Sequence, residues 1–347
     1  MALLNLIRSK KKEIILFLIT TLICFVILEI IVRASWYPPQ DKGYPKELHI
    51  IDEILGYKLK SNYNGNFPMS LYQDKNIVVN SFGLRDSEKN YSKNVELRIL
   101  GLGDSVTFGS GVNNNETYLY ILQKYLEEEK LSAETINAGV SGYELSQEYN
   151  FYKKEGYKYH ADIVTLGIVL NDINEPNISL IKMNMKVFGY HDRPQDKVST
   201  KIIKNICQSC VFFYSLINNY NQIYFREIYS KCSEKKAYNL FKSRIIELNN
   251  NLTEENKKLV LIVFPYTQQF ANGYNLGKYP QEKIKDIADE ENITLIDLLP
   301  YLDVEDYEKY YLYGDNLHLN EEGNKLVAQV ISKKIVTLID NHTSKIN

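Results

Sequence analysis

The chain has 347 residues, and its 41 Lys and Arg nearly balance its 43 Asp and Glu, which leaves a net charge of −2. So small a charge excludes electrostatic binding to nucleic acid as the main function of the whole chain. With 44% hydrophobic and 24% charged residues, the composition excludes a disordered chain and a polytopic membrane protein, and the length suits one large α/β domain with additions.

Residues 14–32 form a nearly unbroken apolar run in which Glu29 is the one acidic residue. As a helix this run would be about 28 Å long, close to the hydrocarbon thickness of a bilayer. Four basic residues precede the run and only Arg33 follows it closely, so the positive-inside rule predicts a cytoplasmic tail over 1–13. A cleaved signal peptide is the rival interpretation, but the run is long for one and no small-x-small cleavage site follows it. The sequence predicts a single-pass signal anchor in the cytoplasmic membrane, with the rest of the chain outside.

Residues 33–95 are rich in turns and polar side chains and show no sustained helical period. We expect an irregular lead-in that packs on the main domain. Within it, residues 80–86 (NSFGLRD) are turn-like, and Arg85 is expected to have a structural role.

From residue 96 to the C-terminus, short apolar runs alternate with amphipathic stretches. The runs typical of buried strands are 97–102, 135–136, 163–166, 259–264 and 293–296. The stretches typical of helices are 118–130, 147–155, 238–257, 284–291 and 321–338. This alternation predicts a three-layer α/β fold with a parallel five-stranded sheet. It breaks down over about 178–236, which we interpret as an insertion, and whether that insertion is a lid stays open.

The four cysteines are too few for a disulfide-built scaffold. Cys24 lies in the apolar run, Cys207 and Cys210 have CxxC spacing, and Cys232 follows them. No second CxxC and no nearby histidine cluster completes a zinc tetrad, so a disulfide or unpaired thiols are favoured. No metal or organic cofactor is implied.

A serine follows the first predicted strand of the domain directly. Ser105 stands in the sequence GDSVTFG, where Gly103 permits a tight turn and Asp104 is expected to bind the backbone of that turn. A serine on a rigid turn at a strand end has the exposure that a nucleophile needs. Ligands of open α/β sheets bind at these carboxyl ends of the strands.

The base for such a serine is predicted after the last strand. Among the five histidines, only His318 has an acid at close spacing there, Asp315 in the sequence DNLH. The Asp315 carboxylate would hold the imidazole tautomer and stabilise the imidazolium formed when Ser105 loses its proton. A helix cap is the structural alternative for Asp315, and both roles are compatible.

An oxyanion hole is the third requirement of this chemistry. The glycines of residues 137–143 (NAGVSGY), after the second strand, can present a backbone N–H group. Asn171, after the third strand, offers a side-chain amide as a second donor.

From about residue 96 onward, the chain resembles the SGNH (GDSL-type) esterase superfamily. Its four marker residues occur in order: Ser105 in GDS, Gly142 in NAGVSGY, Asn171 in VLND and His318 in DNLH. The resemblance implies a flavodoxin-like fold, with Ser105 as nucleophile, His318 as base and Asp315 as its partner. It also implies an oxyanion hole made by the N–H groups of Ser105 and Gly142 and the side chain of Asn171.

Two blocks depart from the pattern of this superfamily. The first reads GDSV in place of GDSL, and in the third Val169 stands where GxND has its glycine. The lead-in, with residues 56–59 (GYKL) and 80–86 (NSFGLRD), is similar to membrane-tethered SGNH proteins associated with the modification of surface polysaccharides. That similarity implies an extracytoplasmic substrate that carries O-acyl groups.

These features favour a serine esterase that removes small O-acyl groups from an extracytoplasmic glycan through an acyl-enzyme. An O-acyltransferase with the same intermediate is the alternative, in which a sugar hydroxyl replaces water and a membrane acyl donor is a partner. A non-catalytic scaffold on this fold is the second alternative. The expected partners are an acylated carbohydrate or another small ester, and the membrane through the N-terminal helix, with no nucleic acid.

Overall fold

The computed structural model describes residues 10–35, 45, 47–67, 75–172, 182, 209, 235–270, 279–313 and 315–343. It divides into two units, Met1–Lys42 with Asp196–Tyr224 and Gly43–Gln195 with Phe225–Asn347, and each is described by itself. Most of the predicted insertion at 178–236 lies outside the described residues, as do Cys207, Cys210 and Cys232.

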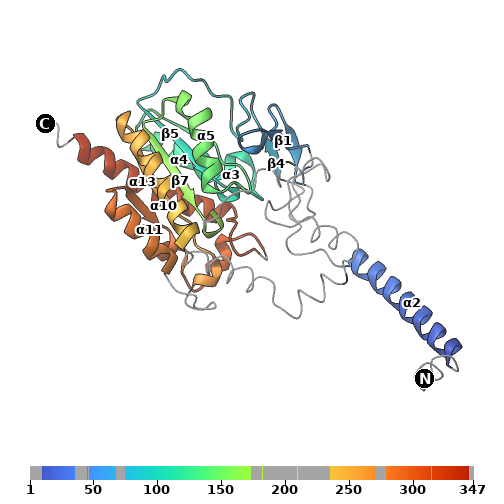
Figure 1. Ribbon diagram of the computed structural model, residues 1–347. Helices are drawn as coiled ribbons and strands as arrows, with labels where there is room; N and C mark the ends of the chain where they lie inside the picture. Colours follow the sequence, from blue (N-terminus) through green and yellow to red (C-terminus); the bar gives the residue numbers. More distant parts are fainter. Residues whose placement is uncertain are drawn as a thin grey trace. The chain divides into compact units, whose positions relative to one another are not determined.

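The first unit contains the N-terminal helix α2, Lys11–Ser35 (Figure 1). Over Lys11–Ala34 this helix is long and apolar enough to cross a membrane, with a mean hydropathy of 3.0, as either an anchor or a signal sequence. Its one acidic residue within the apolar run, Glu29, pairs with Arg33 at 2.7 Å and accepts hydrogen bonds from the N–H and Oγ of Ser209. These partners lower the cost of placing the Glu29 carboxylate in an apolar layer.

The second unit is built on one five-stranded parallel sheet, as predicted. Its strands are β5 (Leu97–Gly103), β6 (Ala133–Asn137), β7 (Ile163–Ile168), β8 (Lys258–Val263) and β9 (Thr294–Asp297). They lie in the order β6-β5-β7-β8-β9, which is the flavodoxin-like order 2-1-3-4-5. In that order the succession of strands reverses between β5 and β7, and ligands of such folds bind beyond the carboxyl ends of the strands at this point.

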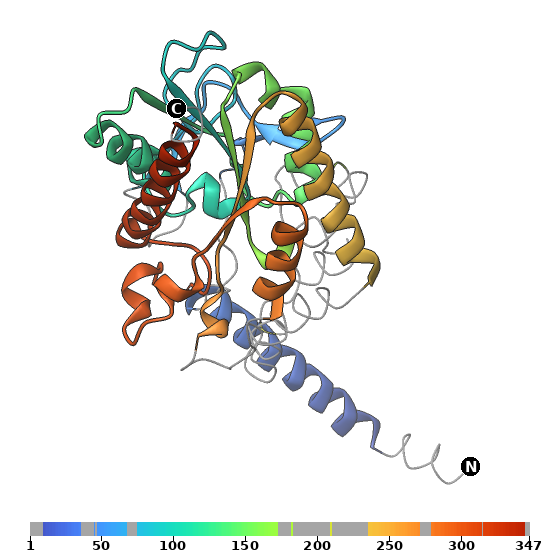
Figure 2. The same cartoon turned by 90° about the vertical axis from the view of Figure 1, so that its left-hand side faces the viewer.

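Helices cover both faces of this sheet and complete the three layers (Figure 2). One face carries α4 (Tyr118–Glu128) and α13 (Glu321–Thr343), which pack together. The other carries α5 (Leu145–Lys154) and α10 (Lys235–Glu254), while α11 (Tyr279–Glu290) packs along β9. Strands buried on both faces explain the continuous apolar runs of the sequence. The short helices used below are α3 (Ser105–Phe108), α12 (Leu299–Leu302) and η4 (Leu170–Asp172).

The lead-in is more regular than the sequence predicts. It contains two small antiparallel sheets, β1 (His49–Asp52) with β2 (Gly56–Leu59), and β3 (Asn64–Asn66) with β4 (Asn76–Val78). Strands of three or four residues are too short to show a period of two above the surrounding turn residues, which is why an irregular segment was expected.

Arg85 joins the lead-in to the loop that follows α3. Its side chain is 1% exposed and donates hydrogen bonds to the carbonyl oxygens of Phe108, Gly109 and Val112 and to Asn114 Oδ1. The guanidinium also lies 4.6 Å from the centre of the Phe108 ring. Because most of its hydrogen bonds go to fixed backbone carbonyl groups, Arg85 has the structural role predicted for it.

Replacing Arg85 by Lys is therefore expected to destabilise the second unit by about 2–4 kcal/mol, because one ammonium cannot reach all of the carbonyls that the planar guanidinium binds. We expect thermal unfolding to show a lower Tm. The matched control is Arg244→Lys, at an ion pair with Glu247 on α10 that is about one-third exposed and so contributes little. An equal Tm for the two variants would contradict the role given to Arg85.

Candidate active site

Ser105 is the first residue of α3, directly after β5. Asp104 caps this helix, because its Oδ1 accepts the Val106 N–H at 2.9 Å. Gly103 has φ +153°, and a Cβ there would lie 2.1 Å from Thr107 Oγ1. A glycine followed by a capping acid thus turns the chain sharply from strand to helix and holds Ser105, which is 8% exposed, at the carboxyl end of β5.

A second glycine lets a neighbouring loop approach α3 closely. Gly139 follows β6, and a Cβ on it would lie 2.3 Å from Phe108 N and 2.6 Å from Thr107 C. The contact atoms belong to the α3 backbone, so only glycine fits without moving the helix that begins with Ser105.

Gly139→Ala is expected to displace α3. We expect kcat to fall by roughly 10²-fold, the order found when catalytic groups shift by about 1 Å. We expect the free energy of unfolding to fall by about 1–3 kcal/mol. Gly65→Ala is the control, since a Cβ there meets only the side chain of Tyr63, which can rotate away. Steady-state kinetics and Tm should separate the two. An unchanged kcat in Gly139→Ala would show that the close approach does not position Ser105.

His318 and Asp315 lie on the loop between Tyr311 and α13. Asp315 Oδ1 accepts the N–H groups of Leu317 at 2.9 Å and His318 at 3.1 Å. Asp315 Oδ2 lies 2.8 Å from His318 Nδ1, and His318 Nε2 lies 2.8 Å from Ser105 Oγ. The structure thus brings Ser105, His318 and Asp315 into one hydrogen-bonded series. With the Asp315 side chain 4% exposed and that of His318 15% exposed, the series is shielded from water.

The turn that carries Gly142 is tied to the end of β5. Its closing hydrogen bond runs from Tyr143 N–H to Val140 O at 3.1 Å, and Gly142 has φ +75°, a conformation that glycine adopts without strain. The Val140 N–H donates to Gly103 O at 3.1 Å. The backbone of Gly142 therefore lies beside the strand end that leads into Ser105.

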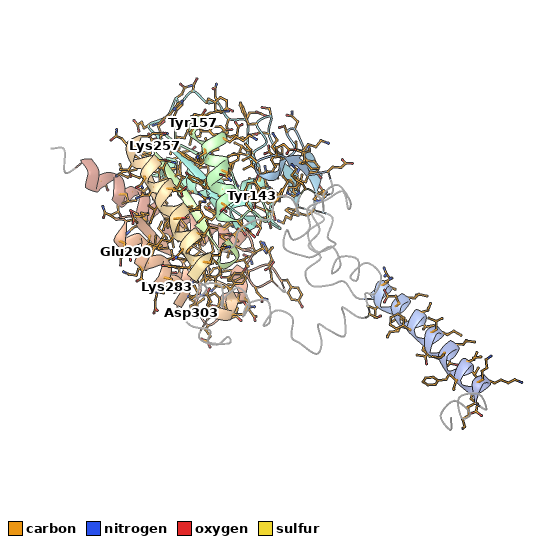
Figure 3. All side chains as sticks on the ribbon, viewed as in Figure 1. Tyr143, Tyr157, Lys257, Lys283, Glu290 and Asp303 are labelled. Atoms are coloured by element: carbon orange, nitrogen blue, oxygen red, sulfur yellow. The ribbon has the colours of Figure 1, made fainter. Side chains whose placement is uncertain are left out.

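Two tyrosines fix this turn from the lead-in side. Tyr57, on β2, donates its hydroxyl to Ser141 O at 2.8 Å, and Tyr143, marked in Figure 3, donates its hydroxyl to Tyr57 O at 2.7 Å. Both side chains are almost fully buried. Sequence analysis missed this role of Tyr57; its only signal was the GYKL segment in which it stands.

Asn171 lies in η4, immediately beyond β7. The turn is closed by Asp172, whose Oδ2 accepts the Val169 N–H at 2.7 Å. Val169 is fully buried, so the position where the superfamily pattern has glycine accommodates valine here. The backbone of Asn171 thus lies at the strand end next to that of Ser105, while its side chain is outside the described atoms.

Asp104, which contacts Ser105, is one of three buried carboxyl groups that interact with one another. Asp104, Glu148 and Asp172 are each at most 2% exposed. Burial raises the pKa of all three, and repulsion among the acids raises the pKa of Glu148 and Asp172 further. Among the described residues, no group of three His, Cys, Asp or Glu side chains is arranged to hold a metal ion.

The family model of the GDSL-like lipase/acylhydrolase family matches residues 102–326, from the end of β5 into α13. Similar solved structures include the acetyl xylan esterase AlAXEase, at 18% identity over 69% of this chain and 100% of that one, with a TM-score of 0.41. They also include the esterase EstA from Pseudoalteromonas sp., at 14% identity over 71% of this chain and 100% of that one, with a TM-score of 0.43. A lipase/acylhydrolase from Enterococcus faecalis has 16% identity over 69% of this chain and 95% of that one, with a TM-score of 0.42. No curated protein matches the chain.

Proposed function

Because the chain belongs to the GDSL-like lipase/acylhydrolase family and is a hydrolase of ester bonds, we propose that it is a serine esterase that removes small O-acyl groups through Ser105, His318 and Asp315. The observation that carries the proposal is the hydrogen-bonded series from Asp315 Oδ2 through the imidazole of His318 to Ser105 Oγ, with 2.8 Å at each step. Such a series is the arrangement that activates a serine hydroxyl.

In this mechanism the Asp315 carboxylate holds the proton of His318 on Nδ1, so that Nε2 accepts the proton of Ser105. The Oγ atom attacks the ester carbonyl carbon, and the carbonyl oxygen becomes an oxyanion. The N–H groups of Ser105 and Gly142 and the side chain of Asn171 are the proposed donors to that oxyanion. The alcohol leaves with the proton from His318, and water then attacks the acyl-enzyme by the reverse proton transfers.

The acyl group is proposed to be small because Ser105 is buried, with only 8% of the residue exposed. The substrate is proposed to be an acylated glycan outside the cytoplasmic membrane. Support for this location comes from the charges around α2. Lys10 precedes the helix, Lys11 and Lys12 begin it and Arg33 lies near its other end, a distribution that favours a cytoplasmic N-terminus.

The test uses the full chain in detergent with p-nitrophenyl acetate, p-nitrophenyl octanoate and an acetylated xylooligosaccharide. Because Ser105 is only 8% exposed, we expect kcat/KM for the acetate ester to exceed that for the octanoate ester by at least about tenfold. We also expect free acetate from the oligosaccharide. Faster hydrolysis of the octanoate ester would contradict a small acyl group. Transfer of acetyl to an added sugar without free acetate would identify an acyltransferase.

A further inference from the structure

The hydroxyl of Ser105 faces two groups that can each accept its proton. His318 Nε2 lies 2.8 Å from Ser105 Oγ on one side, and Asp104 Oδ2 lies 3.0 Å from it on the other. The hydroxyl has a single hydrogen. The Asp315 carboxylate, 2.8 Å from His318 Nδ1, keeps the proton of the neutral imidazole on Nδ1. Two hydrogen bonds to Oγ at these distances therefore require one further proton, on either Asp104 or His318 Nε2.

The two placements of that proton have opposite consequences for catalysis. If Asp104 is protonated, it donates to Oγ, and Ser105 donates to the neutral Nε2 of His318, ready for attack. If Asp104 is ionised and His318 is protonated, the imidazolium donates to Oγ and the hydroxyl points to Asp104. In that second arrangement His318 has no free lone pair and cannot act as the base.

The surroundings of Asp104 favour the protonated form. Asp104 is 1% exposed, and burial raises its pKa although the Val106 N–H and the charge of His318 act in the opposite direction. Glu148, on α5, has no hydrogen-bond partner for either carboxyl oxygen among the described residues, and Asp172 has none for Oδ1. If Asp104 were ionised, its negative charge would lie near these acids, and no cation besides His318 in the described part of the chain would neutralise it.

The charged and titratable groups that face Asp104 come from several elements. The loop before α13 contributes His318, α5 contributes Glu148 with Glu144 at its cap, η4 contributes Asp172, and α4 contributes Tyr118. His318 is the one cation among them in the described part of the chain, and it is shared with Asp315.

We propose that Asp104 is a positioning residue that is protonated in the active enzyme and donates a hydrogen bond to Ser105 Oγ. This hydrogen bond directs the Ser105 proton to His318. Ionisation of Asp104 removes the donor and makes Ser105 unreactive. This inference rests on the proposed role of Ser105 as nucleophile. When the pH rises through the pKa of Asp104, Asp104 loses its proton while His318 stays neutral, and the single hydrogen of Ser105 then bonds to the Asp104 carboxylate instead of His318 Nε2. The reactivity of Ser105 is therefore expected to fall there, whereas a serine, histidine and aspartate alone would retain full reactivity.

The experiment measures the rate at which a fluorophosphonate phosphonylates Ser105, as a function of pH, by intact-protein mass spectrometry of the full chain in detergent. In this reaction Oγ bonds to phosphorus, fluoride leaves, and the Ser105 proton goes to His318, so neither hydrolysis nor acyl transfer is needed. The variants are Asp104→Asn and Asp104→Ala. The amide of Asn can accept the Val106 N–H and donate to Oγ at every pH.

We expect the parent to lose at least tenfold in rate on the alkaline side, and Asp104→Asn to lose no rate there. Asp104→Ala should be slower than Asp104→Asn at all pH values, because it lacks the donor. Asp86→Asn, the same change at a carboxyl that is 12% exposed and pairs with Lys89, should keep the alkaline loss of the parent. An alkaline loss of equal size in Asp104→Asn, or a rate as low as that of Asp104→Ala with an unchanged Tm, would overturn the proposal.

Infrared difference spectra of parent and Asp104→Asn provide a second readout that needs no reactivity. The absorption of a neutral carboxylic acid should be present in the parent and lost in the variant at neutral pH; its absence from the difference spectrum would overturn the proposal even for an unreactive protein. Phosphonylation without any ester hydrolysis would count against the esterase function and leave the role of Asp104 supported.

Discussion

Ser105→Ala is expected to lower kcat for ester hydrolysis by at least about 10⁴-fold, the order seen when a serine nucleophile is removed from such a series. The loss is large because no other group can form the acyl-enzyme, while the proposed oxyanion donors remain and leave a small residual rate. Steady-state kinetics with p-nitrophenyl acetate measure the effect. The Tm should change little, since Ser105 fills a small volume at the start of α3.

Ser146→Ala is the matched control, because Ser146 is also a buried serine at the start of a helix, α5, but lies outside the hydrogen-bonded series. It should keep the activity of the parent. Equal activity of the parent and Ser105→Ala would show that the nucleophile is elsewhere, whatever the geometry around Ser105.

Asp315→Asn is expected to lower kcat by about 10⁴-fold with little change in the fold. The amide oxygen of Asn can still accept the N–H groups of Leu317 and His318, which Asp315 Oδ1 accepts now. The amide nitrogen would then face His318 Nδ1 and move the imidazole proton to Nε2. A protonated His318 Nε2 could only donate to Ser105 Oγ and could not accept its proton. The base would therefore be lost although the loop keeps its structure.

Asp306→Asn is the control for this prediction, since Asp306 is an exposed carboxylate on the same stretch of chain that pairs with Lys309. Its kcat should equal that of the parent. If Asp315→Asn retained a tenth or more of the parent activity, the tautomer of His318 would not depend on Asp315, and the role of the DNLH motif would have to be revised.

Much of the sheet and of the candidate site could be predicted because its signals are local. The strands β5, β7 and β8 are runs of buried, mostly apolar residues. Ser105 stands in a short motif directly after β5, and His318 stands in one that contains Asp315. The start of one helix was predicted less accurately. We expected this helix, α11, to begin at residue 284, but it begins at Tyr279, one residue before Pro280. Proline is compatible with the first turn of a helix but interrupts the apolar pattern from which the start was inferred.

The contacts that join distant segments could not be predicted. The hydrogen bond from Tyr57 to Ser141 spans 84 positions in the sequence, and the donors of Arg85 reach carbonyl groups that any residue type would present. Asp104 was expected only to bind its own turn, and it does so through Oδ1. Its second contact, from Oδ2 to Ser105 Oγ, depends on side-chain directions that no spacing rule contains.

The most direct test of the central claim is mass spectrometry of the full chain trapped during turnover of p-nitrophenyl acetate by rapid acid quench. We expect a mass increase of one acetyl group, located by fragmentation on Ser105 and absent from Ser105→Ala. Acetyl found on a different residue, or rapid turnover by Ser105→Ala, would contradict the assignment of Ser105 as the nucleophile.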